Sequence, residues 1–299
     1  MLLSFAFIVN RIIEYGVNLN RIVSFPTLIV SIVSIVIYAI LVIALATIYY
    51  FLLKIFSSAD ISPKDNIFIY CKSNLYKYLP GNVFHYIGRN QIALDNEVSH
   101  GGPIAATIAE MLLLTIAALI TAIIFAGQRA IKWSLDNYTA HQVIIVVVLI
   151  VMVLLVGVSL FSVISKRKIA VGKIKPANRI RFTAAIKFVV MYIVFFILNG
   201  LMFIVLLRSI GGELSNSLIL PVIGMYTLSW MIGFITPGAP AGLGIREAIM
   251  SALLFGVVEA EVVISAVVVY RIITILGDIV AYIIVHQLGS KSLYQRQAG

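Results

Sequence analysis

Long apolar runs constrain the fold of this chain more than any other feature. A helix that crosses the hydrocarbon core of a bilayer needs about 20 residues. Five runs satisfy that length, at residues 27–53, 104–126, 141–164, 183–207 and 262–287, and a sixth, 217–236, is nearly as apolar. A mean hydropathy of +1.09 with only 11% charged residues is typical of a polytopic membrane protein. The sequence therefore predicts an all-α polytopic membrane protein with about six to eight membrane segments.

Basic residues predict the orientation of these segments. Cytoplasmic loops near helix ends collect Lys and Arg, and residues 165–181 carry seven of them with no acid. We therefore expect a multi-pass protein of the cytoplasmic (inner) membrane with loop 165–181 and the C-terminus on the cytoplasmic side. Parity then places residues 54–103 on that side as well, and requires residues 217–255 to enter from the outside and return there. Residues 1–20 lack a basic start and a convincing cleavage site, so we expect a retained helix that spans the membrane or lies on its surface.

Two broken segments divide the chain into related halves. "LPGNVFHYIGR" in residues 79–89 and "TPGAPAGLGIRE" in residues 236–247 each place a Gly and an Arg a similar distance after Pro-Gly. Paired Gly/Pro-interrupted segments in two inverted halves point to the binding site of a transporter, because non-helical backbone at membrane depth survives only beside protein or a wet cavity. The alternative is a pair of ordinary Pro-terminated helices with external and cytoplasmic loops.

We accordingly expect one transmembrane domain over residues 1–299, with re-entrant hairpins at the two breaks. Its first half covers about residues 27–126, its linking helix residues 141–164 and its second half about residues 183–287. The breaks and the intramembrane charges make up the candidate substrate-binding site, because a charge in the hydrocarbon is costly and marks function. The candidate residues are Pro80, Gly81, Asn82, His85, Gly88, Arg89, Glu110, Pro237, Gly238, Gly242, Gly244, Arg246, Glu247, Arg271 and Asp278.

The two arginines after the breaks leave three interpretations open. Arg89 and Arg246 each offer a planar donor fork that suits the phosphate of an anionic lipid. They could instead pair internally with Glu110 or Glu247, or extend to the membrane interface. For Arg271 and Asp278, seven residues apart on one helix face, structural salt bridging is favoured over phosphate binding.

The remaining polar residues give weaker indications. His85 fits a hydrogen-bonded cavity residue better than a proton carrier. The cluster Asp95, Glu97 and His100 has no second ligand set, so we expect no metal. We also expect no cofactor, because phosphate-binding loops, nucleophile elbows and His-Glu-x-x-His helices are missing from the sequence.

The order of these motifs resembles the lysylphosphatidylglycerol synthase transmembrane family over about residues 27–287. The motifs are "YLPG(x6)GR", a spanning helix with Glu110, "TPGAPAGLGIRE", and a final helix with "YR(x6)D". The strongest part is residues 240–247, where Ala241 stands in place of the usual Gly. The resemblance implies the flippase-like half of proteins that make and translocate aminoacylated lipids. No hydrophilic stretch of domain size occurs in the 299 residues, so we expect a stand-alone member without the soluble synthase domain.

We therefore expect a lipid flippase for an anionic, phosphate-bearing lipid, such as a phospholipid or a polyprenyl-phosphate-linked sugar. The alternatives are a membrane-embedded glycosyltransferase and an accessory subunit of cell-surface polysaccharide or lipid biosynthesis. A glycosyltransferase needs acidic residues in an early external loop, but residues 21–26 contain none. The expected partners are membrane lipids with anionic headgroups, with a second copy of the chain or cell-envelope biosynthesis proteins as further alternatives, and no nucleic acid.

Overall fold

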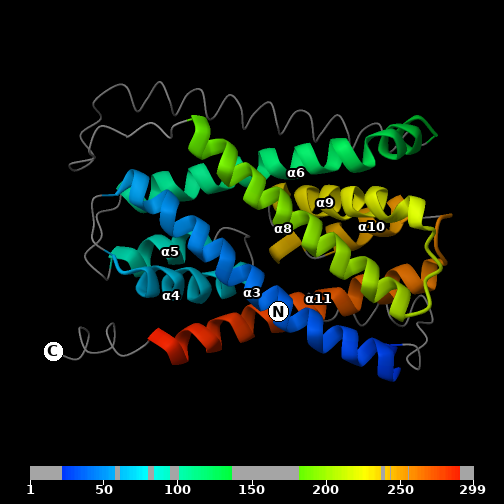
Figure 1. The fold of residues 1–299 in the computed structure, drawn as a ribbon, viewed down its shortest axis with the longest axis horizontal. Helices are drawn as coiled ribbons and strands as arrows, with labels where there is room; N and C mark the ends of the chain where they lie inside the picture. Colours follow the sequence, from blue (N-terminus) through cyan, green and yellow to red (C-terminus); the bar gives the residue numbers. More distant parts are fainter. Residues whose placement is uncertain are drawn as a thin grey trace.

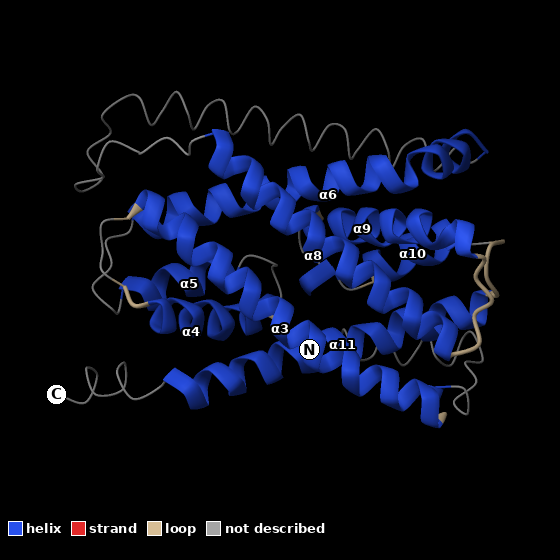
Figure 2. Ribbon diagram, in the orientation of Figure 1, coloured by secondary structure: helices blue, strands red, loops and turns tan. Residues whose placement is uncertain are grey.

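The computed structural model describes residues 22–57, 61–79, 84–94, 101–136, 182–236, 240–242, 244–254 and 256–289. Within these ranges the ordered elements are helices joined by short turns (Figure 2). The predictions for residues 1–20, helix 141–164 and loop 165–181 fall outside them, as do the two Pro-Gly dipeptides.

The described helices follow the order that the apolar runs predict. They are α3 (Phe25–Phe56), α4 (Pro63–Asn74), the 3-10 helix η1 (Leu75–Tyr78), α5 (Phe84–Leu94), α6 (Gly101–Asp136), α8 (Phe182–Ser209), the 3-10 helix η2 (Asn216–Leu218), α9 (Ile219–Ile235), the 3-10 helix η3 (Pro240–Gly242), α10 (Ile245–Leu254) and α11 (Ala260–Gly289). Five segments are long and apolar enough to cross a membrane: Phe25–Phe56, Gly102–Ala126, Thr183–Ser209, Asn216–Ile235 and Ala260–Leu288. The prediction of an all-α polytopic membrane protein is confirmed.

Local sequence sets where several helices begin. Pro26 stands in the first turn of α3, and Pro63 opens α4, at positions where the missing N–H of proline costs nothing. The Ser62 hydroxyl accepts a hydrogen bond from the backbone N–H of Asp65 at 3.1 Å, which caps α4. The start of α4 at Pro63 is therefore well defined by its sequence.

Each half of the described chain contains a long helix, two short arms and another long helix. In the first half these are α3, α4 with α5, and α6; in the second they are α8, α9 with α10, and α11. Figure 1 shows α4 and α5 at the end of the bundle where α3 finishes and α6 starts, and α9 and α10 toward the opposite end. α4 packs on α5 and α9 packs on α10. The short arms thus approach the centre of the molecule from opposite ends.

Small residues let the long helices pack closely. Gly224 of α9 lies against α6, where an added Cβ would come within 2.5 Å of the Ala126 backbone nitrogen. Gly277 of α11 similarly lies against Tyr38 of α3. Close backbone approach at small residues is the usual packing of helices in membranes, where lipid tails remove the hydrophobic drive for association. The outer faces are apolar in turn, with Ile124 at 68% exposure, as expected for surfaces that face lipid.

Candidate functional site

A cavity lies between the two pairs of short arms. It receives side chains from both halves, including α3, α4, α5, α6, α8, α9, α10 and α11. Among the described residues, its charged and imidazole side chains are Lys77, His85, Arg89, Glu110, Arg246 and Arg271. Five of these six belong to the predicted site, and the fold brings them together from segments far apart in the sequence.

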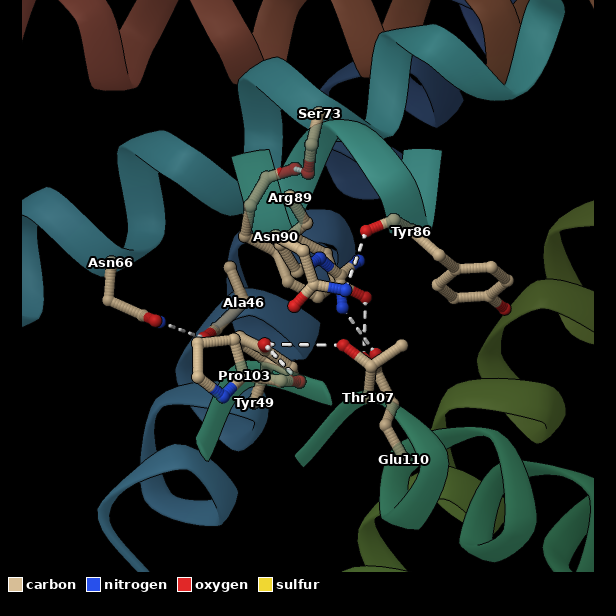
Figure 3. Close-up of polar contacts among 11 residues, drawn as sticks. Ala46, Tyr49, Asn66, Ser73, Tyr86, Arg89, Asn90, Pro103, Thr107 and Glu110 are labelled. Carbon is tan, nitrogen blue, oxygen red and sulfur yellow. Dashed lines mark hydrogen bonds and ion pairs between the residues drawn. The ribbon is translucent and has the colours of Figure 1, made fainter. Parts of the chain in front are cut away.

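Arg89 is held by an internal ion pair, which Figure 3 shows. Its Nη1 donates to Oε2 of Glu110 at 2.6 Å, and the hydroxyl of Tyr70 donates to Oε1 of the same carboxylate at 2.8 Å. The guanidinium carbon lies 3.9 Å from the ring centroid of Tyr70 and 4.4 Å from that of Tyr49. Arg89 is only 2% exposed. This geometry matches the internal-pairing interpretation and fastens α5 to α6.

Gly88 allows α5 to reach this position. An added Cβ at Gly88 would collide with the ring of Tyr76, which belongs to the 3-10 helix η1. The Tyr49 hydroxyl in turn lies 3.3 Å from both the Pro103 carbonyl oxygen and the Thr107 hydroxyl (Figure 3). The start of α6 is therefore tied to α3 beside the ion pair.

Asp278 of α11 forms a second buried ion pair, with Lys77. Its carboxylate lies 2.7 Å from Lys77 Nζ, accepts a 2.7 Å hydrogen bond from Asn74 Nδ2 and accepts another from the Tyr78 hydroxyl. Asp278 thus forms a salt bridge, but with Lys77 of η1 and not with Arg271, the residue that shares its helix face. Arg271 lies two turns away, about 10 Å along the helix, and its Nη2 donates instead to the carbonyl of Ala241 at 2.7 Å.

Arg246 lies in a narrow passage beside η3. An added Cβ at Gly242 would come within 2.7 Å of Arg246 Nε, and one at Gly233 of α9 would collide with the same side chain. The Trp230 ring centroid is 5.2 Å from the guanidinium carbon. Gly242 and Gly244 have φ of +74° and +83°, a conformation that suits glycine. Two predicted glycines thus shape the turn, and one of them makes room for the arginine.

Internal pairing with Glu247, one of the three interpretations of Arg246, is not seen: the two side chains form no ion pair among the described residues. The Nε atoms of Arg246 and Arg271 are buried with no hydrogen-bond partner in this part of the chain, as is Glu247 Oε2. Burial, and then the neighbouring charge of Arg271, lower the pKa of Arg246 to about 10. Glu247 lines a smaller adjoining cavity, whose wall also includes Arg246 and Arg271.

His85 also lines the larger cavity. It is buried against the ring of Tyr86, with 3.7 Å between ring centroids. Burial, with the charges of Arg89 and Lys77, lowers its pKa to about 2. A neutral imidazole is expected there, which fits a cavity residue better than a proton carrier.

Some predicted site residues lie outside the described ranges, and some important residues were missed. Pro80, Gly81, Asn82, Pro237 and Gly238 fall outside, as do Asp95, Glu97 and His100. The missed residues are those that pair with or make room for the predicted charges: Asn74, Lys77, Tyr78, Trp230 and Gly233. Lys77 and Tyr78 belong to the polar stretch "YKYLPG" and could have been included on that basis. Trp230 and Gly233 lie in an apolar run that gives no such indication.

Residues 95–281 match the family model described as lysylphosphatidylglycerol synthase TM region. The chain belongs to this family. The matched region includes Glu110, α9, η3, α10 and most of α11, but starts after Arg89. No curated protein and no solved structure gives a significant match. Family membership and the apolar helices establish a lipid-related, multi-pass membrane protein.

Proposed function

We propose that this protein binds a lipid with an anionic, phosphate-bearing headgroup and translocates it across the cytoplasmic membrane. Arg246 and Arg271 hold the phosphate in the larger cavity. The cargo is a phospholipid or a polyprenyl-phosphate-linked sugar. Because the chain belongs to a lipid-related membrane family, a lipid is the natural source of the anion.

The proposal rests on one observation: of the four cationic side chains of the cavity, two have a carboxylate partner among the described residues and two do not. Arg89 lies 2.6 Å from a Glu110 oxygen and Lys77 lies 2.7 Å from an Asp278 oxygen. Arg246 and Arg271 have no carboxylate partner in the described part of the chain. Arg271 is buried and Arg246 is partly buried. A charge removed from water without a counter-charge is strongly unfavourable, so these two arginines favour an anionic ligand.

The cavity also suits movement of a headgroup between membrane faces. It lies between arms that approach from opposite ends of the bundle (Figure 1), and the charges needed to hold a polar group lie inside it. An inverted arrangement of two halves supports alternate access from each side. An accessory subunit has no use for buried arginines, because their insertion costs free energy.

Transport can be tested with purified protein in liposomes. We expect a tail-labelled anionic phospholipid to equilibrate between leaflets without ATP and without chemical change. Arg246→Gln and Arg271→Gln should each lower lipid binding about 10- to 100-fold, because hydrogen bonds to charged groups contribute about 1.5–3 kcal/mol. Arg246→Lys should also weaken binding, because an ammonium cannot reproduce the fork.

Lys187→Gln is the control variant, because Lys187 is exposed on α8 and should leave binding unchanged. Mass spectrometry of the recovered lipid separates the rival functions. A sugar added to or released from the lipid would support the glycosyltransferase instead. Normal lipid binding by both Arg246→Gln and Arg271→Gln would contradict the proposal that these two arginines hold the phosphate.

A further inference from the structure

Two cationic side chains of the larger cavity have no ion-pair partner among the described residues. Arg89 is paired with Glu110, and Lys77 is paired with Asp278. Burial keeps His85 neutral. Arg246 and Arg271 remain; Glu247 lines the smaller cavity together with both of them but forms an ion pair with neither.

The two arginines also approach the ligand as two separate donor groups. A guanidinium can bind two oxygens through a fork, although Nη2 of Arg271 already donates to the Ala241 carbonyl. A phosphodiester has two non-bridging oxygens, whereas a terminal phosphate has three. Nε of Arg246 and Nε of Arg271 both lack an acceptor among the described residues. Arg271 is only 6% exposed, so water compensates its charge poorly.

We infer that the cavity selects a headgroup with a terminal, dianionic phosphate, either a phosphomonoester or a diphosphate, over a phosphodiester. This inference rests on the proposed function and narrows its cargo, because a sugar joined to a polyprenol through a single phosphate is a phosphodiester and would be disfavoured. A phosphodiester would neutralise one arginine and leave the other without a counter-charge. A terminal phosphate balances both charges and supplies an oxygen to each fork.

The test compares probes that share acyl chains and differ in phosphate charge. Binding to the full chain in detergent is measured for phosphatidic acid, for phosphatidylglycerol and for inorganic phosphate, each at pH 5 and pH 8. We expect phosphatidic acid to bind at least about tenfold more tightly than phosphatidylglycerol at pH 8. The second ionisation of a phosphomonoester lies near pH 6, so this ratio should shrink at pH 5. Phosphatidylglycerol reports any effect of pH on the protein itself.

Variants connect that ratio to the arginines. Arg246→Gln and Arg271→Gln should each bring the ratio at pH 8 close to one, because a single remaining charge is balanced by either lipid. Lys187→Gln should leave it unchanged. Glu247→Gln should also leave it unchanged; a clear rise in the ratio would mean that Glu247 neutralises an arginine in the native protein and would overturn the charge count.

The outcomes separate this inference from the proposed function. Equal binding of the two lipids by the native protein at pH 8 overturns the dianion inference and leaves anionic-lipid binding standing. Failure of both lipids to bind rejects the proposed function as well. Inorganic phosphate that binds as tightly as phosphatidic acid would show that the acyl chains contribute nothing, which identifies a soluble phosphate as the ligand and overturns the lipid source.

Discussion

Arg89 and Arg246 follow similar Pro-Gly breaks, but their surroundings give them different roles. Arg89 is enclosed by Glu110 and by the rings of Tyr49 and Tyr70, so its charge is satisfied within the protein. Arg246 has an aromatic neighbour in Trp230 but no carboxylate partner among the described residues. The sequence alone suggests two equivalent arginines, but the structure pairs only Arg89 with a carboxylate among the described residues.

Arg89 and Glu110 should each be needed for stability only while the other is present. Removing one member of a buried ion pair costs about 3–5 kcal/mol, because the other charge stays buried alone. Arg89→Gln and Glu110→Gln should therefore each sharply lower the stability of the solubilised protein. The double variant should recover much of it, since two neutral amides can hydrogen-bond. Thermal unfolding in detergent measures the effect, and additive losses in the double variant would contradict the pairing.

At the scale of elements, α9 and η3 position Arg246 through two glycines. Gly233 stands on α9 and Gly242 in η3, and the arginine side chain passes between them. Gly242 also has φ of +74°, so its substitution would change the backbone as well. Gly233 is helical, and only its lack of a side chain is needed.

Gly233→Ala should therefore disturb the arginine and preserve the helix. Alanine favours the helix by up to about 1 kcal/mol over glycine, but its methyl group would displace Arg246. We expect near-native thermal stability with at least about tenfold weaker anionic-lipid binding. Gly224→Ala in the same helix is the matched contrast: its methyl group meets the backbone of α6, so it should lower stability. Unchanged lipid binding in Gly233→Ala would show that Arg246 does not need this position.

The sequence predicts the positions of the long helices well, but not the side-chain contacts between distant segments. The apolar run 183–207 predicts α8 closely, which the structure places at Phe182–Ser209, because a lipid-facing helix must be apolar along its length. α6 extends to Asp136, ten residues beyond its predicted end, since a helix can continue after its apolar part stops. The Lys77–Asp278 pair joins residues about 200 positions apart, and no local pattern specifies such a contact.

At the scale of the whole molecule, the short arms meet at one cavity from opposite ends of the bundle. α4 with η1 and α5 occupies one end, and α9 with α10 the other (Figure 1). Lys77 of the first group and Arg246 of the second both line the cavity. α11 contacts both sides of it, because Asp278 pairs with Lys77 and Arg271 donates to the Ala241 carbonyl of η3.

The predicted topology can be tested by labelling single cysteines in intact and permeabilised cells. Ser215 and Ala260 are exposed at the two ends of the α9–α10 segment, and Lys64 is exposed at the start of α4. The native Cys71 is buried and should give little background. If α9 and α10 enter and leave from one face, Ser215→Cys and Ala260→Cys should both react with an impermeant reagent from outside. Lys64→Cys should react only after permeabilisation, because basic residues favour the cytoplasmic side.

Labelling of Ser215→Cys and Ala260→Cys from opposite faces would instead mean that α9–α10 crosses the membrane. The inverted repeat and the alternate-access route would then fail together, while the buried arginine site could still bind its ligand from one side.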